Sequence, residues 1–242
     1  MQKSLLVFGG NGFVGSHICK YAVQQGIKVY SVSRSGKPKQ PERVLQEVEY
    51  LKGNALDQSS YSEIIPQVDA VVHSIGVLID SRTPLNIINK YEGSYEQMNR
   101  DTALRICELI HGQNKTFVYM SAERGMFFSP RYLSTKREVE TYLAQNQNQI
   151  PSCVVRPGFV ASKEQTDKRV LGMVIDTLWK QDALYQKLGL SKFSETFVPS
   201  RSLDVNVIAK AAVLGAFNPE FRGRTLDVND IERAAQEYQS VF

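Results

Sequence analysis

One segment near the start of the chain restricts the fold more than any other. An apolar run from Ser4 to Phe8 leads directly into a glycine-rich turn, and a helical pattern follows from Phe13. Glycines in such a turn let the chain reverse tightly, let backbone N–H groups approach a pyrophosphate, and let helix and strand pack closely. The helix N-terminus adds partial positive charge for the phosphates. The sequence therefore predicts a dinucleotide-binding turn rather than a plain flexible one, made of Gly9, Gly10, Asn11, Gly12, Phe13, Val14 and Gly15.

Strand-like and helix-like patterns alternate along the residues that follow. Short apolar runs rich in β-branched residues are separated by segments with apolar residues at helical spacing. Such alternation predicts a doubly wound α/β Rossmann fold with a parallel sheet and right-handed crossovers. Strands are expected at 4–8, 28–33, 48–51, 70–74, 116–120, 153–156 and near 225–228, and helices at 13–25, 61–66, 95–111, 131–146, 168–180, 203–217 and the C-terminal end.

The length of 242 residues is typical of one undivided α/β domain. We expect a dinucleotide-binding core over 1–160 and a small C-terminal cap over 161–242, integrated with the core and covering the substrate side of the cofactor cleft. The polar segments 35–41 and 80–93 are predicted surface loops, and the second is long enough to form a lid.

Charge and cysteine usage exclude several classes of protein. The formal net charge of the chain is +4, but the basic residues are scattered along the sequence, so nucleic acid binding is not expected. No apolar run approaches the ~20 residues that span a bilayer. Cys19, Cys107 and Cys153 lack metal-ligand spacing, which predicts buried core thiols in a reducing compartment and no metal site. Because the first strand begins near Met1, we also expect no targeting peptide within this sequence.

The end of the second predicted strand bears on the choice of cofactor. NAD-binding turns of this type are followed about 20 positions later by an acidic residue that binds the ribose. Here Ser33 and Arg34 stand near that place and no acid does. A guanidinium pairs bidentately with a 2′-phosphate, and Ser33 can donate a further hydrogen bond. The sequence thus favours NADP(H) over NAD(H), unless Arg34 and Lys37 are solvated loop charges.

A tyrosine and a lysine form the candidate catalytic pair. Tyr132 and Lys136 are four residues apart, a spacing that places both side chains on one helix face. The ammonium is expected to lower the phenol pKa, so that Tyr132 can donate or accept a proton. Ser121, at a strand end, would orient a carbonyl or hydroxyl of the substrate. Taken alone, the pair also fits a packed aromatic beside a solvated amine.

The order of these motifs resembles the short-chain dehydrogenase/reductase superfamily, in its extended and atypical branches. The resemblance spans most of the chain and includes the G-x-x-G-x-x-G pattern at Gly9, Gly12 and Gly15. Two positions depart from the family pattern, because Ser121 precedes Tyr132 by only eleven residues and Asn54 stands where relatives often have an adenine-binding aspartate. The resemblance implies cofactor contacts from Asn54, His73, Ser74, Gly76, Tyr132, Lys136, Pro157 and Gly158, and support of the lysine through water by Asn99.

Within the superfamily, the strings at 7–13, 31–37, 121–125 and 155–159 look like a fungal mitochondrial group associated with the coenzyme Q (ubiquinone) biosynthetic complex. They are more distantly similar to the NADPH-binding accessory subunit of respiratory complex I. This resemblance implies a location on the matrix side of the mitochondrial inner membrane and a quinone precursor as substrate. The alternative is a non-catalytic NADPH-binding subunit of an inner-membrane complex. An apolar stripe within 170–179 either faces such a partner or the membrane surface, or packs on the sheet.

Overall fold

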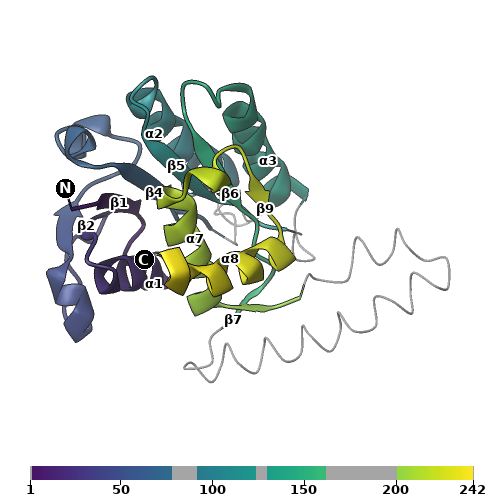
Figure 1. Cartoon of the computed structure of the whole chain (residues 1–242). Helices are drawn as coiled ribbons and strands as arrows, with labels where there is room; N and C mark the ends of the chain where they lie inside the picture. Colours follow the sequence, from purple (N-terminus) through teal and green to yellow (C-terminus); the bar gives the residue numbers. More distant parts are fainter. Residues whose placement is uncertain (1, 78–91, 124–129, 162–200, 242) are drawn as a thin grey trace.

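The main sheet is parallel throughout. In this computed structural model, residues 2–77, 92–123, 130–161 and 201–241 are described (Figure 1). Seven strands follow the order β3-β2-β1-β4-β5-β6-β9, so the order reverses direction between β1 and β4. The doubly wound parallel sheet that the sequence predicts is therefore confirmed. The strands are β1 (Ser4–Phe8), β2 (Lys28–Ser33), β3 (Glu49–Lys52), β4 (Ala70–His73), β5 (Thr116–Met120), β6 (Ser152–Val155) and β9 (Thr225–Leu226).

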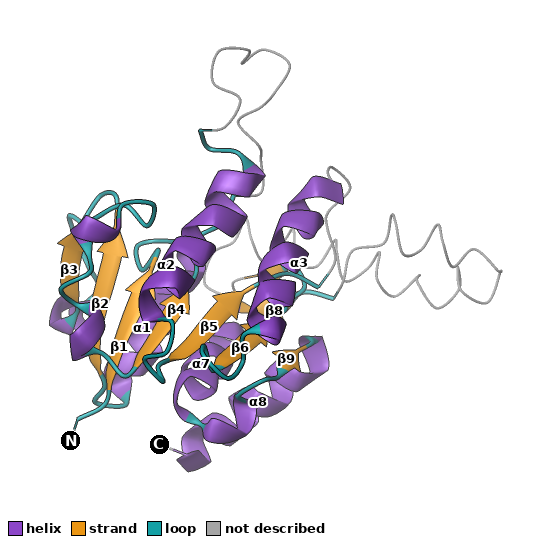
Figure 2. Ribbon diagram, turned by 90° about the horizontal axis from the view of Figure 1, so that it is seen from above, coloured by secondary structure: helices purple, strands orange, loops and turns teal. Residues whose placement is uncertain are grey.

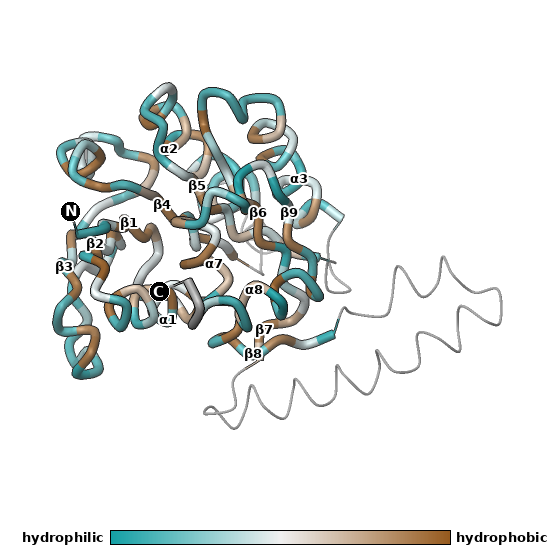
Figure 3. Tube along the Cα trace, in the orientation of Figure 1, coloured by the Kyte–Doolittle hydropathy of each residue, from teal (hydrophilic) through white to brown (hydrophobic). Residues whose placement is uncertain are grey.

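Helices cover both faces of this sheet (Figures 1 and 2). Side chains alternate along β1, so Leu5 and Val7 join the core under one set of helices while Leu6 and Phe8 join the core under the other. Burial on both faces explains why the central strands β1, β4 and β5 are largely apolar, as the hydropathy colours of Figure 3 display. One set is α1 (Phe13–Gln24), α7 (Val205–Phe217) and α8 (Val228–Val241), and the other is α2 (Thr102–Ile110) and α3 (Pro130–Gln145).

The helix expected over 61–66 is not formed, and that prediction is wrong. The segment contains turns flanked by two single 3₁₀ turns, η2 (Gln58–Ser60) and η3 (Ile65–Gln67). The Tyr61 ring packs edge-on against Phe8 at 4.7 Å, and its hydroxyl donates to the carbonyl of Ala55 at 3.0 Å. Seating this one aromatic side chain in the core decides the local path of the chain.

Two further helices differ from expectation at their N-terminal ends. The helix expected from 203 begins at Val205, because β8 (Leu203–Asp204) pairs with β7 (Val160–Ala161) in a separate two-stranded sheet. The Asp204 carboxylate then caps α7 by accepting from the N–H of Asn206 at 2.8 Å. The helix expected over 95–111 begins as a π-helical turn, η4 (Glu96–Asp101), and continues as α2.

The described part of the C-terminal segment belongs to the body of the fold. Within residues 161–242, β9 is a strand of the main sheet, and α7 and α8 pack on the face of the sheet that is lower in Figure 1. The Tyr238 hydroxyl on α8 donates to the carbonyl of Tyr21 on α1 at 2.6 Å, which joins the two ends of the chain. The predicted cap helix at 168–180, the apolar stripe within 170–179 and most of the predicted 80–93 lid lie outside the described residues.

All three cysteines are free thiols buried in the core, as their apolar surroundings in the sequence predict. Across the described ranges, no cluster of three or more His, Cys, Asp or Glu side chains is arranged to hold a metal ion. No helix in the same ranges has the length and apolar character that a bilayer crossing requires.

Candidate functional site

A cleft of about 580 Å³ opens at the carboxyl ends of the first four strands of the sheet. The sheet order reverses beside β1 at this point, which is where ligands bind in open parallel sheets. Eight residues predicted from the sequence line it, namely Gly9, Asn11, Gly12, Ser33, Arg34, Asn54, Ser74 and Gly76. The other lining residues include Val32, Ser35, Gly53, Leu56, Ile75, Val77, Gln97, Met98 and Thr102.

The glycine turn has the geometry that a pyrophosphate cradle requires. Gly9 adopts φ +81°, a left-handed conformation that favours glycine, and its carbonyl accepts from the N–H of Gly12 at 2.8 Å. A Cβ on Gly15 would lie 2.2 Å from the Gly9 oxygen, and one on Gly10 would lie 2.2 Å from Ser31 Oγ. Gly10 and Gly15 therefore act by close packing below the turn, while Gly9 and Gly12 line the cleft.

The start of α1 completes the cradle. Gly12 occupies the N-cap position, where it offers no side chain to the first N–H groups of the helix. Such a helix N-terminus is an anion site of the kind that holds phosphates. Phe13 and Val14, the next two residues, are partly buried and lie outside the cleft lining, where Phe13 packs edge-on against the His17 ring at 5.4 Å.

Asn11 ties the turn to the end of β2. Its amide nitrogen donates to Ser33 Oγ at 2.8 Å, to Ser35 Oγ at 2.9 Å and to the carbonyl of Gly36. The Asn11 amide oxygen is buried and has no hydrogen-bond partner among the described residues. Because a buried acceptor without a donor is costly, a ligand hydroxyl at this point would relieve the cost. The cradle and this acceptor together fit the ribose and pyrophosphate of a dinucleotide.

A basic edge adjoins Asn11. Arg34, Lys37 and Lys52 are exposed, and within the described ranges none of them forms an ion pair. A Cβ on Gly36 would lie 3.2 Å from Lys52 Cβ, so the end of β3 packs directly against the loop that carries Arg34. Sequence reasoning missed Lys52 because its proximity to Arg34 depends on the pairing of β2 with β3.

The helix α3 brings Tyr132 and Lys136 together, as their spacing predicts. Lys136 is 3% exposed, and its ammonium lies 5.6 Å from the centroid of the Tyr132 ring and donates to the carbonyl of Met120 at 2.8 Å. Burial lowers the Lys136 pKa to about 8. Burial also raises the Tyr132 pKa to about 12, opposite to the direction expected from the sequence. Removal of the phenolate from water outweighs the attraction of the Arg137 charge.

Tyr95 is a neighbour of this pair that the sequence did not single out. Its ring is 4% exposed and packs edge-on against Tyr132, with 5.6 Å between ring centroids. The Arg131 guanidinium lies 6.0 Å from the Tyr95 centroid and forms a salt bridge with Glu96 at 2.5 Å. The exposed end of α3 is thereby attached to the start of η4.

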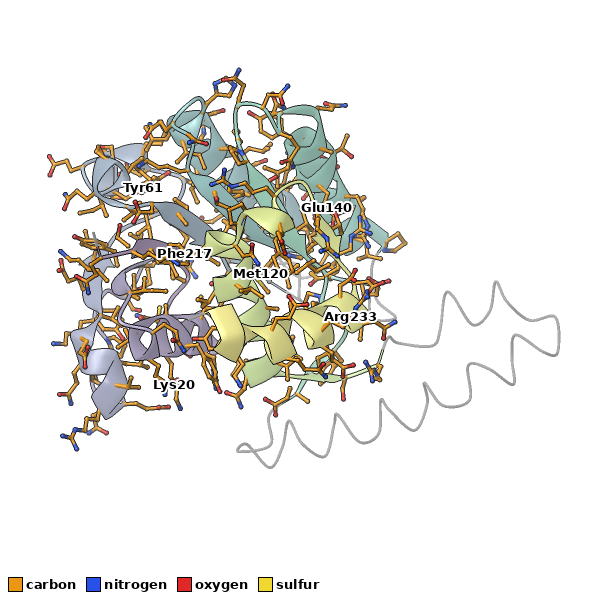
Figure 4. The ribbon with its side chains drawn as sticks, viewed as in Figure 1. Lys20, Tyr61, Met120, Glu140, Phe217 and Arg233 are labelled. Atoms are coloured by element: carbon orange, nitrogen blue, oxygen red, sulfur yellow. The ribbon has the colours of Figure 1, made fainter. Side chains whose placement is uncertain are left out.

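Ser121 is drawn into a charged network behind the candidate pair. Its hydroxyl donates to the carboxylate of Glu140, which also forms salt bridges with Arg137 and Arg156. Glu140 belongs to α3, and Figure 4 labels it together with Met120 at the end of β5. The network joins the carboxyl ends of β5 and β6 to α3. A role for Ser121 in orienting the substrate stays a prediction.

A substitution tests how much this network contributes to stability. Burial by itself raises the Glu140 pKa, but hydrogen bonds from Arg156 and Ser121 and the charge of Arg137 outweigh it and hold the pKa below its usual value. Because both arginines keep about a third of their side chains exposed, we expect Glu140→Gln to lower the free energy of unfolding by about 2 kcal/mol at pH 7, less than for a fully buried pair. Denaturant titration measures the loss.

The pH dependence of that loss follows from the sign of the shift. A carboxylate with a lowered folded pKa stabilises the fold above its unfolded pKa of about 4.3 and loses the contribution as the pH falls through the folded value. The difference between wild type and variant should therefore shrink below about pH 4. The matched control is Glu138→Gln. Glu138 lies on α3, as Glu140 does, and forms an exposed salt bridge with Arg100. Its replacement should lower the free energy of unfolding by less than about 0.5 kcal/mol. Equal losses for both variants would refute the role assigned to Glu140.

The fourth-strand residues fall into two environments. Ser74 and Gly76 line the cleft directly. His73 is fully buried in β4, outside the lining, and its Nε2 is 2.9 Å from the Thr102 hydroxyl. Burial lowers the His73 pKa to about 3, so the imidazole is neutral near pH 7. A direct cofactor contact from His73 stays a prediction.

Of the remaining predicted residues Asn99, Asn54, Pro157 and Gly158, Asn54 alone is among the residues that line the cleft. Asn99, in η4, accepts the N–H of Val77 at 2.9 Å through its amide oxygen, next to the cleft. Asn54 is exposed and uses its amide oxygen to accept from its own turn. Pro157 is buried after β6, and its carbonyl accepts the N–H of Glu123 at 2.9 Å, while the adjoining Gly158 is partly exposed.

Comparison with known proteins agrees with this architecture. The family model described as "NAD dependent epimerase/dehydratase family" matches residues 5–190. A Saccharomyces cerevisiae protein, MIOREX complex component 2, is 26% identical over 92% of this chain and 96% of its own length. Among solved structures, a short-chain type dehydrogenase/reductase from Mycobacterium ulcerans has a TM-score of 0.68 at 14% identity, covering 96% of this chain and 90% of that one. A short-chain dehydrogenase/reductase superfamily protein from Agrobacterium tumefaciens with bound NAD has a TM-score of 0.62 at 18% identity, covering 92% and 76%.

The sheet order and the cleft together define a Rossmann-type α/β fold, which the chain shares with solved short-chain dehydrogenase/reductase structures. The chain belongs to the NAD dependent epimerase/dehydratase family. The description of this family as NAD dependent agrees with the dinucleotide-binding turn that the sequence predicts.

Proposed function

We propose that this chain is an NADP(H)-binding oxidoreductase whose preference for the phosphorylated dinucleotide comes from Arg34. The observation that carries the proposal is the exposed guanidinium in the cleft lining, without an ion pair among the described residues and beside Lys37 and Lys52. The glycine turn would hold the pyrophosphate and Asn11 a ribose hydroxyl. When bound, the nicotinamide would give or accept a hydride.

The candidate pair handles the proton in this proposal. With a pKa of about 12, Tyr132 keeps its hydroxyl proton near pH 7 and can donate it to an oxygen on the substrate. With a pKa of about 8, Lys136 is mainly protonated near neutral pH, and its charge would stabilise the phenolate left after the transfer. Tyr95, packed against Tyr132, holds the ring in place.

The proposed substrate is a quinone precursor of ubiquinone biosynthesis, on the matrix side of the mitochondrial inner membrane. Support comes from the resemblance of the strings at 7–13, 31–37, 121–125 and 155–159 to the fungal mitochondrial group. The similarity to a yeast complex component supports an association with protein partners. Conversion of quinone intermediates by the purified protein, followed by ubiquinone content in a Tyr132→Phe strain, tests this proposal. Absence of turnover together with normal ubiquinone in that strain would contradict it.

The Arg34→Ala variant tests the cofactor preference. Loss of a charge-assisted contact to the 2′-phosphate should weaken NADP⁺ binding by about 2 kcal/mol, or roughly 30-fold, and leave NAD⁺ binding within about twofold. Titration calorimetry with both nucleotides measures the change. The matched control is Arg43→Ala, which removes the same charge from an exposed position outside the cleft lining. Equal weakening of NAD⁺ and NADP⁺ by Arg34→Ala would contradict the assignment.

A second candidate function is a non-catalytic subunit that binds NADP(H) within a complex. Two observations favour it, because Ser121 donates to Glu140 and the Lys136 ammonium donates to the carbonyl of Met120. Both groups have partners within the protein. Normal ubiquinone in a Tyr132→Phe strain, combined with partner proteins that co-purify only with the nucleotide-bound form, would favour this candidate. A turnover rate that depends on Tyr132 would exclude it.

A further inference from the structure

The π-helical turn η4, just before α2, has two carbonyl groups bound by side-chain hydroxyls. A π-turn shifts the backbone hydrogen bond from the fourth to the fifth residue, which widens the helix and alters the bonding of its carbonyls. The Thr102 hydroxyl donates to the carbonyl of Met98 at 2.8 Å, and the Tyr119 hydroxyl donates to the carbonyl of Asn99 at 2.6 Å. Side chains thus hold the turn in its widened form.

These hydroxyls attach the turn to two adjacent strands. Tyr119 on β5 and His73 on β4 are register partners, and both side chains are fully buried. Because the Thr102 hydroxyl proton is directed to Met98, the His73 Nε2, 2.9 Å away, acts as the donor to Thr102. The His73 and Tyr119 rings pack with 5.5 Å between centroids. The sheet therefore determines where the turn lies.

The π-helical turn also holds residues 76 and 77, which line the cleft. The Asn99 amide oxygen accepts the N–H of Val77 at 2.9 Å, and Val77 lines the cleft. A Cβ on Gly76 would lie 3.2 Å from that same oxygen and 3.7 Å from the Lys136 nitrogen. The Asn99 oxygen and the Lys136 nitrogen therefore converge on Gly76.

We propose that Tyr119 is a positioning residue for the nicotinamide end of the cleft, an inference that rests on the proposed function. Its hydroxyl holds the carbonyl of Asn99, and the Asn99 side chain in turn holds the 76–77 segment beside Lys136. The hydroxyl is too deeply buried to touch a ligand, so it acts through Asn99. Its removal should therefore loosen one end of the cleft and leave the phosphate-binding end unchanged.

The experiment compares Tyr119→Phe with Tyr238→Phe. Each variant loses one buried hydroxyl that donates to a backbone carbonyl at 2.6 Å, but Tyr238 bonds to Tyr21 on α1 and lies outside the cleft lining. Dissociation constants for NADP⁺ and for 2′,5′-ADP, which lacks the nicotinamide end, are measured by titration calorimetry, with unfolding midpoints alongside. We expect Tyr119→Phe to raise the dissociation constant for NADP⁺ at least fivefold and to leave the dissociation constant for 2′,5′-ADP within twofold of the wild-type value. Tyr238→Phe should leave both ligands within twofold despite a similar loss of stability.

A second variant, Asn99→Ala, tests the same inference if Tyr119→Phe folds poorly. Asn99→Ala keeps the carbonyl that Tyr119 binds and removes only the amide, and it should weaken NADP⁺ alone by a similar factor. Parallel weakening of both ligands, or of neither, in these variants would overturn the inference while the proposed function stands. Wild-type protein that binds neither ligand would overturn the proposed function and this inference with it.

Discussion

Replacement of Gly15 by alanine is expected to abolish dinucleotide binding and to destabilise the fold. The added Cβ would lie 2.2 Å from the carbonyl oxygen of Gly9 and 2.7 Å from Ser74 Oγ. The Gly9 backbone cannot move freely, because its N–H donates to the carbonyl of Val32 at 2.9 Å and its φ is +81°. Helix α1 must therefore shift away from the turn. We expect at least a 100-fold loss of NADP⁺ affinity and a loss of about 3 kcal/mol in the free energy of unfolding.

The control for this variant is a second tightly packed glycine away from the cleft. A Cβ on Gly215, in α7, would lie 2.9 Å from Cys153 Sγ, a side-chain atom in the core under α7. Gly215→Ala should also lower the denaturation midpoint, but the fraction that remains folded should bind NADP⁺ with wild-type affinity. Calorimetry at a temperature where both variants are folded measures the affinities. A Gly15→Ala protein with unchanged affinity would refute the cradle.

Replacement of Lys136 by methionine is expected to change turnover and stability in opposite directions. Loss of the ammonium beside Tyr132 should reduce turnover by about 10²- to 10⁴-fold, the usual contribution of a positioned acid–base group. The same substitution removes a buried cation whose pKa falls from 10.5 to about 8. That shift is worth about 3 kcal/mol at neutral pH, and the lost hydrogen bond to Met120 offsets about 1 kcal/mol of it. The variant should therefore be more stable than wild type at pH 7.

The pH dependence of this gain has a definite sign. Because the folded pKa of Lys136 lies below its unfolded value, the buried charge destabilises the wild type fully below about pH 8. The wild type regains this stability as the pH rises from about 8 to 10.5, so the advantage of the variant should shrink over that range. Lys210, a partly buried lysine over the rings of Tyr21 and Tyr238, is the matched control. Lys210→Met should leave turnover unchanged. An advantage of Lys136→Met that is constant with pH would contradict the argument.

The functional consequences of these variants depend on features that the sequence predicts to different degrees. The glycine turn is predictable, because the left-handed φ of Gly9 and the close approach of Gly15 to the Gly9 oxygen both act between residues close in the chain. The alternation of strands and helices is predictable for the same reason, since burial on two faces leaves a local pattern of apolar residues. Tyr132 and Lys136 share a face of α3 because one helical turn separates them. The apolar pattern of segment 61–66 predicts a helix that is not formed, because Tyr61 packs against Phe8, a residue far away in the chain.

Sequence alone determined the parallel Rossmann architecture and the residues of the phosphate-binding turn, because short-range sterics and apolar periodicity encode both. Only the tertiary structure decided the environments that control their chemistry. It directs Ser121 to Glu140, raises the Tyr132 pKa by burial, and places Lys52 beside the Arg34 loop. Tyr119 and Asn99 lie twenty residues apart in the chain and meet through one hydrogen bond. Such contacts join residues from separate elements, so their geometry exists only after the sheet and helices have packed.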